Sequence, residues 1–133
     1  MMTKLIRIGT IYVPVLDVDF SAAWYEEKLG ASVNYKDKEK AIVDLANVSV
    51  FLVKANRNQS ANFKDNQGNE CFSATFEVDG EEELVALHKD LREKEVKTGA
   101  IEDRGHPGRN FVFFDPDGNM FDVWSELSRN SQK

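Results

Sequence analysis

One order of elements, a strand, a helix and three more strands, is predicted twice along the 133 residues. In the first series, residues 6–18 alternate in polarity with a period of two, which is typical of a strand. A helix follows and ends at Gly30, a residue that favours the left-handed conformation after a helix. Short β-branched runs then predict strands at 31–35, 41–45 and 48–53.

The second series repeats this order after a polar interval. Residues 72–78 alternate again, and Asp79-Gly80 leads into a helix that extends to about Lys94. Further strands are predicted at 96–101, 109–114 and 120–124. Neither copy can bury its own sheet, so two βαβββ modules are expected to pair around a pseudo-twofold axis in an α+β fold.

Each predicted helix has an apolar side. Asp17 and Asp19 can cap the first helix, whose apolar face is expected to hold Phe20, Ala23 and Trp24. The stripe of the second helix is Leu84, Leu87, His88 and Leu91.

The interval between the series, residues 55–70, is polar, rich in Asn and without periodicity. Loops of this length are usually functional lids or mobile connections. Phe63 either enters a site or is a partly exposed loop aromatic. The sequence thus predicts one domain over residues 1–133, with modules at about 4–54 and 71–127.

Composition excludes several classes of partner. Hydrophobic residues make up 41% and charged residues 30%, as in soluble globular proteins. No apolar run approaches the ~20 residues of a membrane span, and no secretory signal is evident. The single cysteine, Cys71, favours a reducing compartment, so a cytoplasmic location is expected. The net charge of −6 without a basic stripe argues against nucleic acid.

Three stretches carry a family resemblance: IYVPVLDVDFSAAWYEEKLG at the front, FSATFEVDG in the middle, and FFDPDGN with FDVWSE at the end. With them the chain resembles the vicinal oxygen chelate superfamily, which includes glyoxalase I, bleomycin-resistance proteins, fosfomycin-resistance enzymes and extradiol dioxygenases. The resemblance covers nearly the whole chain. It implies curved sheets around a concave cavity, helices on the outside, and a homodimer.

Members of this superfamily that hold a metal use four ligands, usually two His and two Glu, two from each module. Carried over by position, these ligands fall on Thr10, on or next to Phe51, on Ser73 and on Asp122. Only Asp122 is a good ligand, and one carboxylate does not hold a transition metal. No metal and no cofactor are therefore expected.

Strand parity predicts a mixed lining of the concave wall, made of aromatic rings, hydroxyls and one acid. Such a wall suits an apolar or aromatic small molecule that a few polar groups orient, although the aromatic rings could instead pack together in a collapsed cavity. An apolar core would hardly recruit three polar side chains on one wall, which favours binding. The predicted lining is Thr10, Tyr12, Phe51, Ser73, Thr75, Met120, Asp122 and Trp124.

Other polar residues have weaker claims. Asp122 is a weak candidate for a general base; hydrogen bonds to the Thr10 or Ser73 hydroxyl are the favoured alternative. His106 and Arg109, in a predicted loop, could meet an anionic group of a ligand, although an exposed His and a solvated Arg are commoner.

The leading prediction is a metal-free binder similar to bleomycin-resistance proteins, which sequesters an aromatic or amphipathic compound. The alternative is a glyoxalase- or dioxygenase-like enzyme with a non-standard metal site, drawn from Asp122, Glu77 and His106. A third possibility is a regulatory or immunity module whose cavity meets a protein segment. The resemblance leaves open whether any catalysis occurs.

Overall fold

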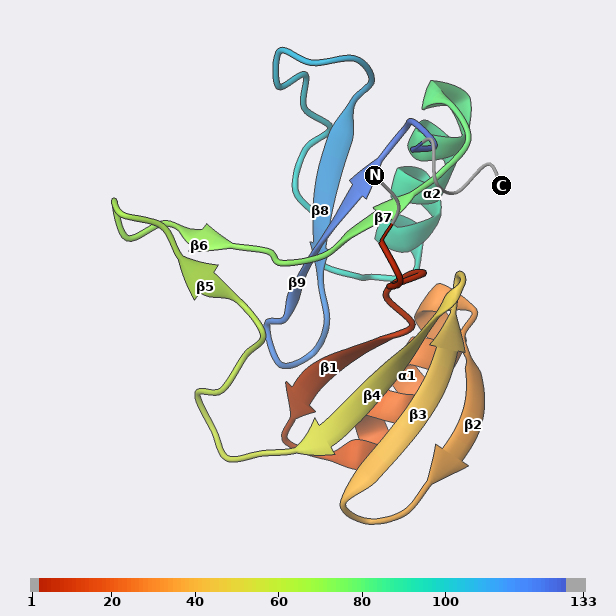
Figure 1. Cartoon of the computed structure of the whole chain (residues 1–133), viewed down its shortest axis with the longest axis vertical. Helices are drawn as coiled ribbons and strands as arrows, with labels where there is room; N and C mark the ends of the chain where they lie inside the picture. Colours follow the sequence, from red (N-terminus) through yellow and green to blue (C-terminus); the bar gives the residue numbers. More distant parts are fainter. Residues whose placement is uncertain (1–2, 129–133) are drawn as a thin grey trace. The chain divides into compact units, whose positions relative to one another are not determined.

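The computed structural model describes residues 3–128 and divides into two compact units between Gln59 and Ser60. We call these units module 1 and module 2 and describe each by itself. The boundary falls inside the polar segment 55–70. Each module contains one helix and one mixed sheet (Figure 1). Within residues 3–128, neither helix has the length and apolar character that crossing a membrane requires.

Module 1 has a four-stranded sheet in the order β1-β4-β3-β2. The strand β1 is parallel to β4, and the other neighbours are antiparallel. The elements are β1 (Thr10–Val15), α1 (Val18–Leu29), β2 (Ser32–Lys36), β3 (Lys40–Leu45) and β4 (Val48–Lys54).

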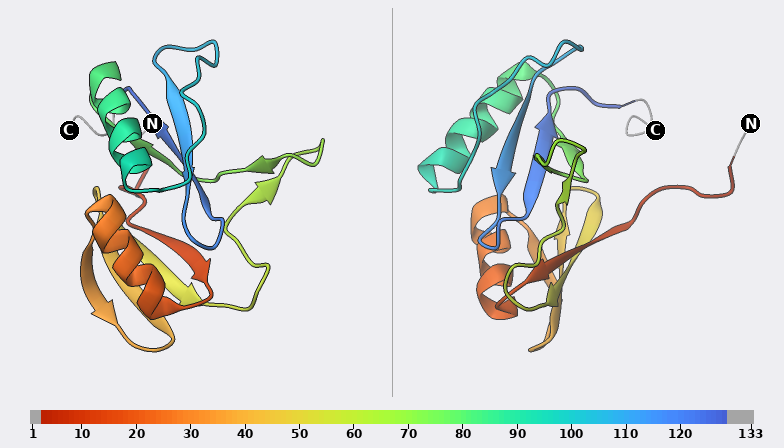
Figure 2. Two further views of the ribbon diagram at one scale, coloured as in Figure 1. Left: turned by 180° about the vertical axis from the view of Figure 1, so that it is seen from behind. Right: turned by 90° about the vertical axis from the view of Figure 1, so that its left-hand side faces the viewer.

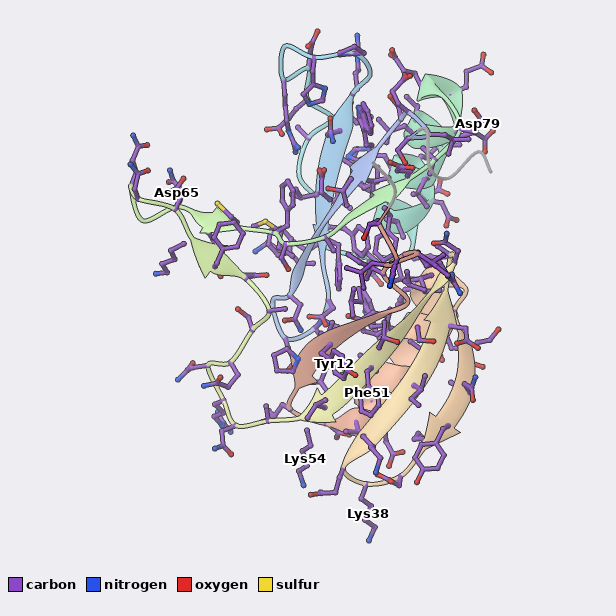
Figure 3. All side chains as sticks on the ribbon, viewed as in Figure 1. Tyr12, Lys38, Phe51, Lys54, Asp65 and Asp79 are labelled. Atoms are coloured by element: carbon purple, nitrogen blue, oxygen red, sulfur yellow. The ribbon has the colours of Figure 1, made fainter. Side chains whose placement is uncertain are left out.

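The period-two pattern of module 1 separates the two faces of its sheet. One face packs on α1, which lies along one side of the sheet (Figure 2). On the other face the rings of Tyr12 and Phe51 lie side by side, as Figure 3 shows. The residues buried on the helix side are each at most 2% exposed: Val13, Val15, Ala41, Val43, Val50 and Leu52.

The helix α1 begins and ends where the sequence predicts, but its buried side differs. The Asp17 carboxylate accepts a hydrogen bond from the backbone N–H of Phe20 at 3.0 Å, and Gly30 ends the helix at φ +73°. The predicted face of Phe20, Ala23 and Trp24 is wrong, because Phe20 is 59% exposed. The helix instead packs through small side chains that allow close approach to the sheet, and a Tyr fills the remaining space: Val18, Ser21, Ala22 and Tyr25.

Module 2 repeats the connectivity of module 1. Its main sheet has the order β7-β9-β8, with β7 parallel and β8 antiparallel to β9. The predicted repeat is therefore confirmed, and the fold is α+β with two βαβββ-like modules. The elements are β5 (Phe63–Lys64), β6 (Glu70–Cys71), β7 (Thr75–Glu77), α2 (Glu81–Glu93), β8 (Asn110–Phe114) and β9 (Met120–Trp124).

Three predictions for module 2 need correction. The leading strand is shorter than 72–78 because pairing begins only at Thr75. The segment 96–101 is not a strand: it forms one isolated bridge, Thr98 to Phe113, and a second bridge, Glu102 to Asn110, follows it. Gly99 lies between these bridges, and glycine weakens a strand. The polar interval contains the β5–β6 hairpin, whose turn begins at Asp65, labelled in Figure 3.

The two faces of the module 2 sheet also differ. One face holds an aromatic cluster in which the Phe113 and Phe121 ring centroids are 5.4 Å apart. The α2 stripe packs on this side, because the His88 ring lies 4.8 Å from that of Phe111 in an edge-to-face contact. His88 also bonds the Gly99 carbonyl through Nε2 at 2.9 Å, so it has a structural role. The other face of the sheet carries the polar residues considered next.

Candidate functional site

Asp122 is a buried carboxylate in the middle of the module 2 sheet. It lies on β9, the central strand, opposite Thr75 of β7 and Val112 of β8. Its residue is 2% exposed, although it faces away from the aromatic cluster. A buried carboxylate is costly unless it is paired and hydrogen-bonded, so its surroundings determine what it can do.

The two oxygens of Asp122 have different partners. Oδ2 accepts hydrogen bonds from the Thr75 hydroxyl at 3.0 Å and from Nδ2 of Asn110 at 2.9 Å. The hydroxyl partner is thus Thr75, where the sequence suggested Ser73 or Thr10. Oδ1 lies 3.1 Å from Nη1 of Arg104, but without the alignment of a hydrogen bond. Within residues 3–128, Oδ1 accepts no hydrogen bond.

Arg104 supplies the positive charge beside Asp122. Its side chain is 26% exposed, and its Nε donates to Oε1 of Glu102 at 2.9 Å. The guanidinium also lies over the Phe72 ring, 5.5 Å from the centroid. One cation therefore serves two carboxylates, and this cluster of Glu102, Arg104 and Asp122 has a net charge of −1.

The orientation of the Asn110 amide follows from the chemistry of its neighbour. An ionised carboxylate only accepts hydrogen bonds, so the amide must turn its NH₂ toward Asp122. Oδ1 of Asn110 then points elsewhere and finds no donor among residues 3–128. Asn110 is 3% exposed, and leaving a buried acceptor unpaired costs about 1–3 kcal/mol.

These groups line a cavity of about 790 Å³ within module 2. The apolar and aromatic residues of its lining are Phe72, His106, Pro107, Trp124 and Leu127. The polar residues of its lining are Thr75, Glu77, Arg104, Asn110, Asp122, Glu126 and Ser128. This mixture, an apolar wall with a few convergent polar groups, is typical of small-molecule sites.

The indole of Trp124 is held in place on this wall. Its Nε1 donates to the Pro107 carbonyl at 2.9 Å, and the His106 ring meets it edge to face at 5.8 Å. Gly108, at φ +79°, allows this arrangement, because a Cβ there would lie 2.9 Å from the indole nitrogen. Trp124 is therefore a preorganised aromatic surface.

The structure brings together some of the predicted site residues of module 2. Thr75, Asp122 and Trp124 line the same cavity. Ser73 is exposed and is not part of its lining. Arg109 also lies outside the lining, and its Nε is 3.4 Å from Oε1 of Glu81.

The predicted residues of module 1 share one face of their own sheet. Tyr12 pairs with Phe51 in the β1–β4 register, and their ring centroids are 5.2 Å apart. Phe51, whose position the sequence left uncertain by one residue, therefore lies on the same face as Tyr12. Thr10 lies on the same strand as Tyr12, opposite Ser49, and is exposed.

Asn110 and Arg104 are site residues that the sequence did not predict. Strand alternation could have identified Asn110. It places Asn110 on the same face as Val112, which is the register partner of Asp122. Arg104 lies in the irregular segment before β8, where no periodicity indicates the direction of a side chain.

The residues present do not fit a metal centre. Across the described part of the chain, 3–128, no three His, Cys, Asp or Glu side chains are grouped to hold a metal ion. The set of Asp122, Glu77 and His106 therefore does not form a metal site. The Asp122 carboxylate already faces the Arg104 cation, and Oε1 of Glu77 accepts a bond from the Ser128 N–H at 3.0 Å.

Two βαβββ-like modules with an acid, Asp122, on the last strand define the class of protein to which the chain belongs. Comparison with known families identifies this class. The sequence model of the Glyoxalase/Bleomycin resistance protein/Dioxygenase superfamily matches residues 7–123. The chain belongs to this superfamily. A comparison with curated proteins gives no match.

Solved structures share the fold at low sequence identity. Lactoylglutathione lyase from Agrobacterium tumefaciens has a TM-score of 0.73 and 15% identity, covering 92% of this chain and 96% of its own. The antibiotic binding protein TnmS3 from Streptomyces sp. CB03234 has a TM-score of 0.70 and 19% identity, covering 95% and 100%. The fosfomycin resistance protein FosX from Listeria monocytogenes has 0.70 and 15%, covering 98% of each. A lyase, an antibiotic binding protein and a resistance protein thus share this fold, which by itself does not decide the function.

Proposed function

We propose that the chain is a metal-free binding protein that holds an aromatic or amphipathic small molecule in the module 2 cavity. One observation carries this proposal: a fixed indole, Trp124, stands beside a buried polar cluster around Asp122 in a cavity of about 790 Å³. The aromatic wall would contact the body of the ligand, and the polar groups would orient it.

The arrangement of Asp122 supports orientation more than proton abstraction. A general base must come within hydrogen-bond reach of the proton that it removes. Oδ2 of Asp122 already accepts two hydrogen bonds, and Oδ1 faces a guanidinium. A carboxylate with one oxygen hydrogen-bonded and the other beside a cation is stabilised in its charged form, which suits it to orient a polar group of a ligand.

The proposal extends to both modules. Tyr12, 65% exposed and stacked on Phe51, offers a second aromatic surface for a ligand. Ser73 and Thr10 remain candidate polar contacts, and Arg109 a candidate contact for an anionic group. The structural relative TnmS3 is an antibiotic binding protein, which supports a sequestering role for this chain.

The first experiment compares two substitutions after a thermal-shift screen of aromatic compounds. For any compound that stabilises the protein, we expect Trp124→Ala to weaken binding at least about tenfold in calorimetry, because it removes a fixed stacking surface. Ser73→Ala removes a candidate polar contact that lies outside the cavity lining and should weaken binding less than Trp124→Ala does, by about twofold. Equal and negligible losses in both variants would overturn the proposal.

Metal analysis tests the proposal against the enzyme alternative. We expect mass spectrometry to find near-zero transition metal in the purified protein, before and after incubation with Ni, Zn, Mn and Fe(II). About one metal ion per chain would instead establish a ligand set that differs from the one considered above and would favour an enzyme.

We also propose that the chain forms a homodimer, as the superfamily resemblance implies. The chain mass is 15.1 kDa, so light scattering after size exclusion should give about twice this value. A mass equal to one chain at micromolar concentration would overturn this part of the proposal.

A further inference from the structure

We propose that the ligand carries a positively charged nitrogen on an aromatic framework, and that this nitrogen pairs with Asp122 in place of Arg104. This inference rests on the proposed binding function and specifies the chemical class of ligand. The candidate class is the aryl-alkyl amines and aromatic amidines.

The charge of the cavity favours a cation. Among the described residues that line it, Glu77, Asp122 and Glu126 are acids, and Arg104 is the one Lys or Arg side chain. Arg104 is shared with Glu102, a further acid outside the lining. An anionic ligand would have to compete with two carboxylates for this guanidinium, whereas a cation would meet a surplus of negative charge.

Two buried acceptors without a donor define the polar end of the ligand. Oδ1 of Asn110 and Oδ1 of Asp122 accept no hydrogen bond from residues 3–128, and both residues are at least 97% buried. Nearly all buried acceptors in proteins are hydrogen-bonded, so this pair points to a donor from outside the chain. An ammonium or amidinium group has several N–H donors and the charge that the carboxylate needs.

Arg104 is able to give way. Its guanidinium is tied to the protein by Glu102 as well as by Asp122, and it lies over the Phe72 ring. It can therefore leave Oδ1 of Asp122 and remain paired with the Glu102 carboxylate, whose side chain is 56% exposed. In this arrangement Arg104 is a resident counter-ion that the cation of the ligand replaces.

The aromatic requirement comes from the wall beside these acceptors. Phe72, His106 and Trp124 present rings to the same cavity as Asp122 and Asn110. A flat apolar group can stack on Trp124 while a short arm carries the cation to the acid. A cation near aromatic faces gains further attraction from the ring quadrupoles.

The test uses three naphthalene probes of similar shape: 1-naphthylmethylammonium, 1-naphthalenemethanol and 1-naphthaleneacetate. Calorimetry with the full chain at pH 7 should give a Kd for the ammonium at least about tenfold lower than for the alcohol, because a charged hydrogen-bonded pair adds that much. The acetate should bind most weakly. Raising the salt concentration should weaken the ammonium more than the alcohol.

Variants of Asp122 and Arg104 show whether the charge of the probe matters or only the stacking of its ring. Asp122→Asn should abolish the preference for the ammonium over the alcohol. Arg104→Gln should strengthen ammonium binding, because the competing cation is gone. Arg92→Gln, on α2 and outside the cavity lining, is the control for loss of one positive charge and should leave all three affinities unchanged. Should Asp122→Asn fail to fold, the Arg104 variant and the wild-type series still decide.

The outcomes distinguish the two proposals. Equal binding of all three probes, or tightest binding of the acetate, would overturn the cation inference and leave the aromatic site standing. Weaker ammonium binding in Arg104→Gln would also overturn it. Binding of none of the probes at millimolar concentration would overturn the aromatic site itself.

Discussion

The side chains of Asn62 and Asn119 are bonded reciprocally: each accepts a hydrogen bond from the backbone N–H of the residue next to the other. The side-chain oxygen of Asn119 accepts from the N–H of Ala61 at 2.8 Å, and that of Asn62 accepts from the N–H of Met120 at 2.8 Å. The Asn62 amide also donates to the Gly118 carbonyl at 2.9 Å. The polar segment before β5 is thus fastened to the turn between β8 and β9.

Module 2 contains two turns of the same kind, and the one between β8 and β9 receives this contact. In Asp115–Asn119, Oδ1 of the Asp accepts from the N–H groups two and four residues later, and the Asn amide donates to Oδ2. The hairpin turn Asp65–Asn69 has the same bonds. These backbone N–H groups, of Asn69 first, hold the pKa of Asp65 below its usual value. The D-x-x-G-N sequence is therefore a self-bonded turn.

The pair of turns offers a matched test of the Asn62–Asn119 contact. Asn119→Ala should lower the free energy of unfolding by about 1–3 kcal/mol, because Asn119 is fully buried and its loss leaves the Ala61 N–H without this acceptor. Asn69→Ala removes the equivalent side chain from the exposed turn and should cost about 0.5 kcal/mol or less. Urea denaturation of both variants checks this, and equal losses would contradict the assigned role.

Gly108 is expected to be essential for the position of Trp124. A Cβ at Gly108 would lie 2.6 Å from Oγ of Ser125 and 2.7 Å from Cγ of Glu126, as well as against the indole. Gly108→Ala should displace the Trp124 ring, cost about 1–3 kcal/mol of stability and weaken ligand binding.

Gly105 supplies the control, because it also has a positive φ, +86°, but open space around its Cβ position. Gly105→Ala should show the backbone cost alone, about 1 kcal/mol, with unchanged tryptophan fluorescence. The comparison uses denaturation and emission spectra. Identical spectra for Gly108→Ala and wild type would refute the expected displacement.

Alternation in the sequence was sufficient to predict the sheet faces but not the phase of the first helix. In β1 and β4, side chains must point to opposite faces in turn, so parity predicts one face for Tyr12 and Phe51, although the sequence left Phe51 open by one residue. A helix has no such constraint when both of its candidate stripes contain apolar residues. Phe20 suggested one stripe, while the close approach to the sheet selected the stripe with Ala22 and Tyr25.

The site residues that lie on strands could be predicted from the sequence, and those in irregular segments could not. Thr75 and Asp122 could be placed on one face from parity, and Asn110 follows from the same rule. Arg104 depends on the path of an irregular segment whose bridges are separated by unpaired residues, so sequence periodicity carried no information about it.

Thr75→Val tests the hydrogen bond that covers Asp122 from β7. Val has nearly the shape of Thr but cannot donate, so Oδ2 loses the bond at 3.0 Å. We expect a loss of about 1–3 kcal/mol in unfolding free energy, as for hydrogen bonds to charged groups. Thr98→Val, at the bridge to Phe113, is a hydroxyl deletion outside the cavity and should cost less. A cost for Thr75→Val that does not exceed that of Thr98→Val in urea denaturation would show that the hydroxyl contributes little.

Asp37 should make module 1 sensitive to acid. Its carboxylate accepts from the Tyr35 hydroxyl at 2.6 Å, from the Glu39 and Lys40 backbone N–H groups at 2.8 and 2.9 Å, and from the Lys40 ammonium at 3.1 Å. These bonds, led by that of Tyr35, hold the pKa of Asp37 far below its ordinary value of 3.8. A folded-state pKa below that of the unfolded chain adds stability above pH 3.8, and this stability declines as the pH falls further.

The variant Asp37→Asn should therefore be less stable than wild type at pH 7, and the difference should be smaller at pH 2.5. Denaturant titrations at both values measure it. Glu39→Gln, in the same turn with a side chain 75% exposed, removes a charge without these bonds and should show little change at either pH. A wild-type advantage over Asp37→Asn that stays constant or grows toward low pH would mean that the hydrogen bonds of Asp37 do not favour its charged form.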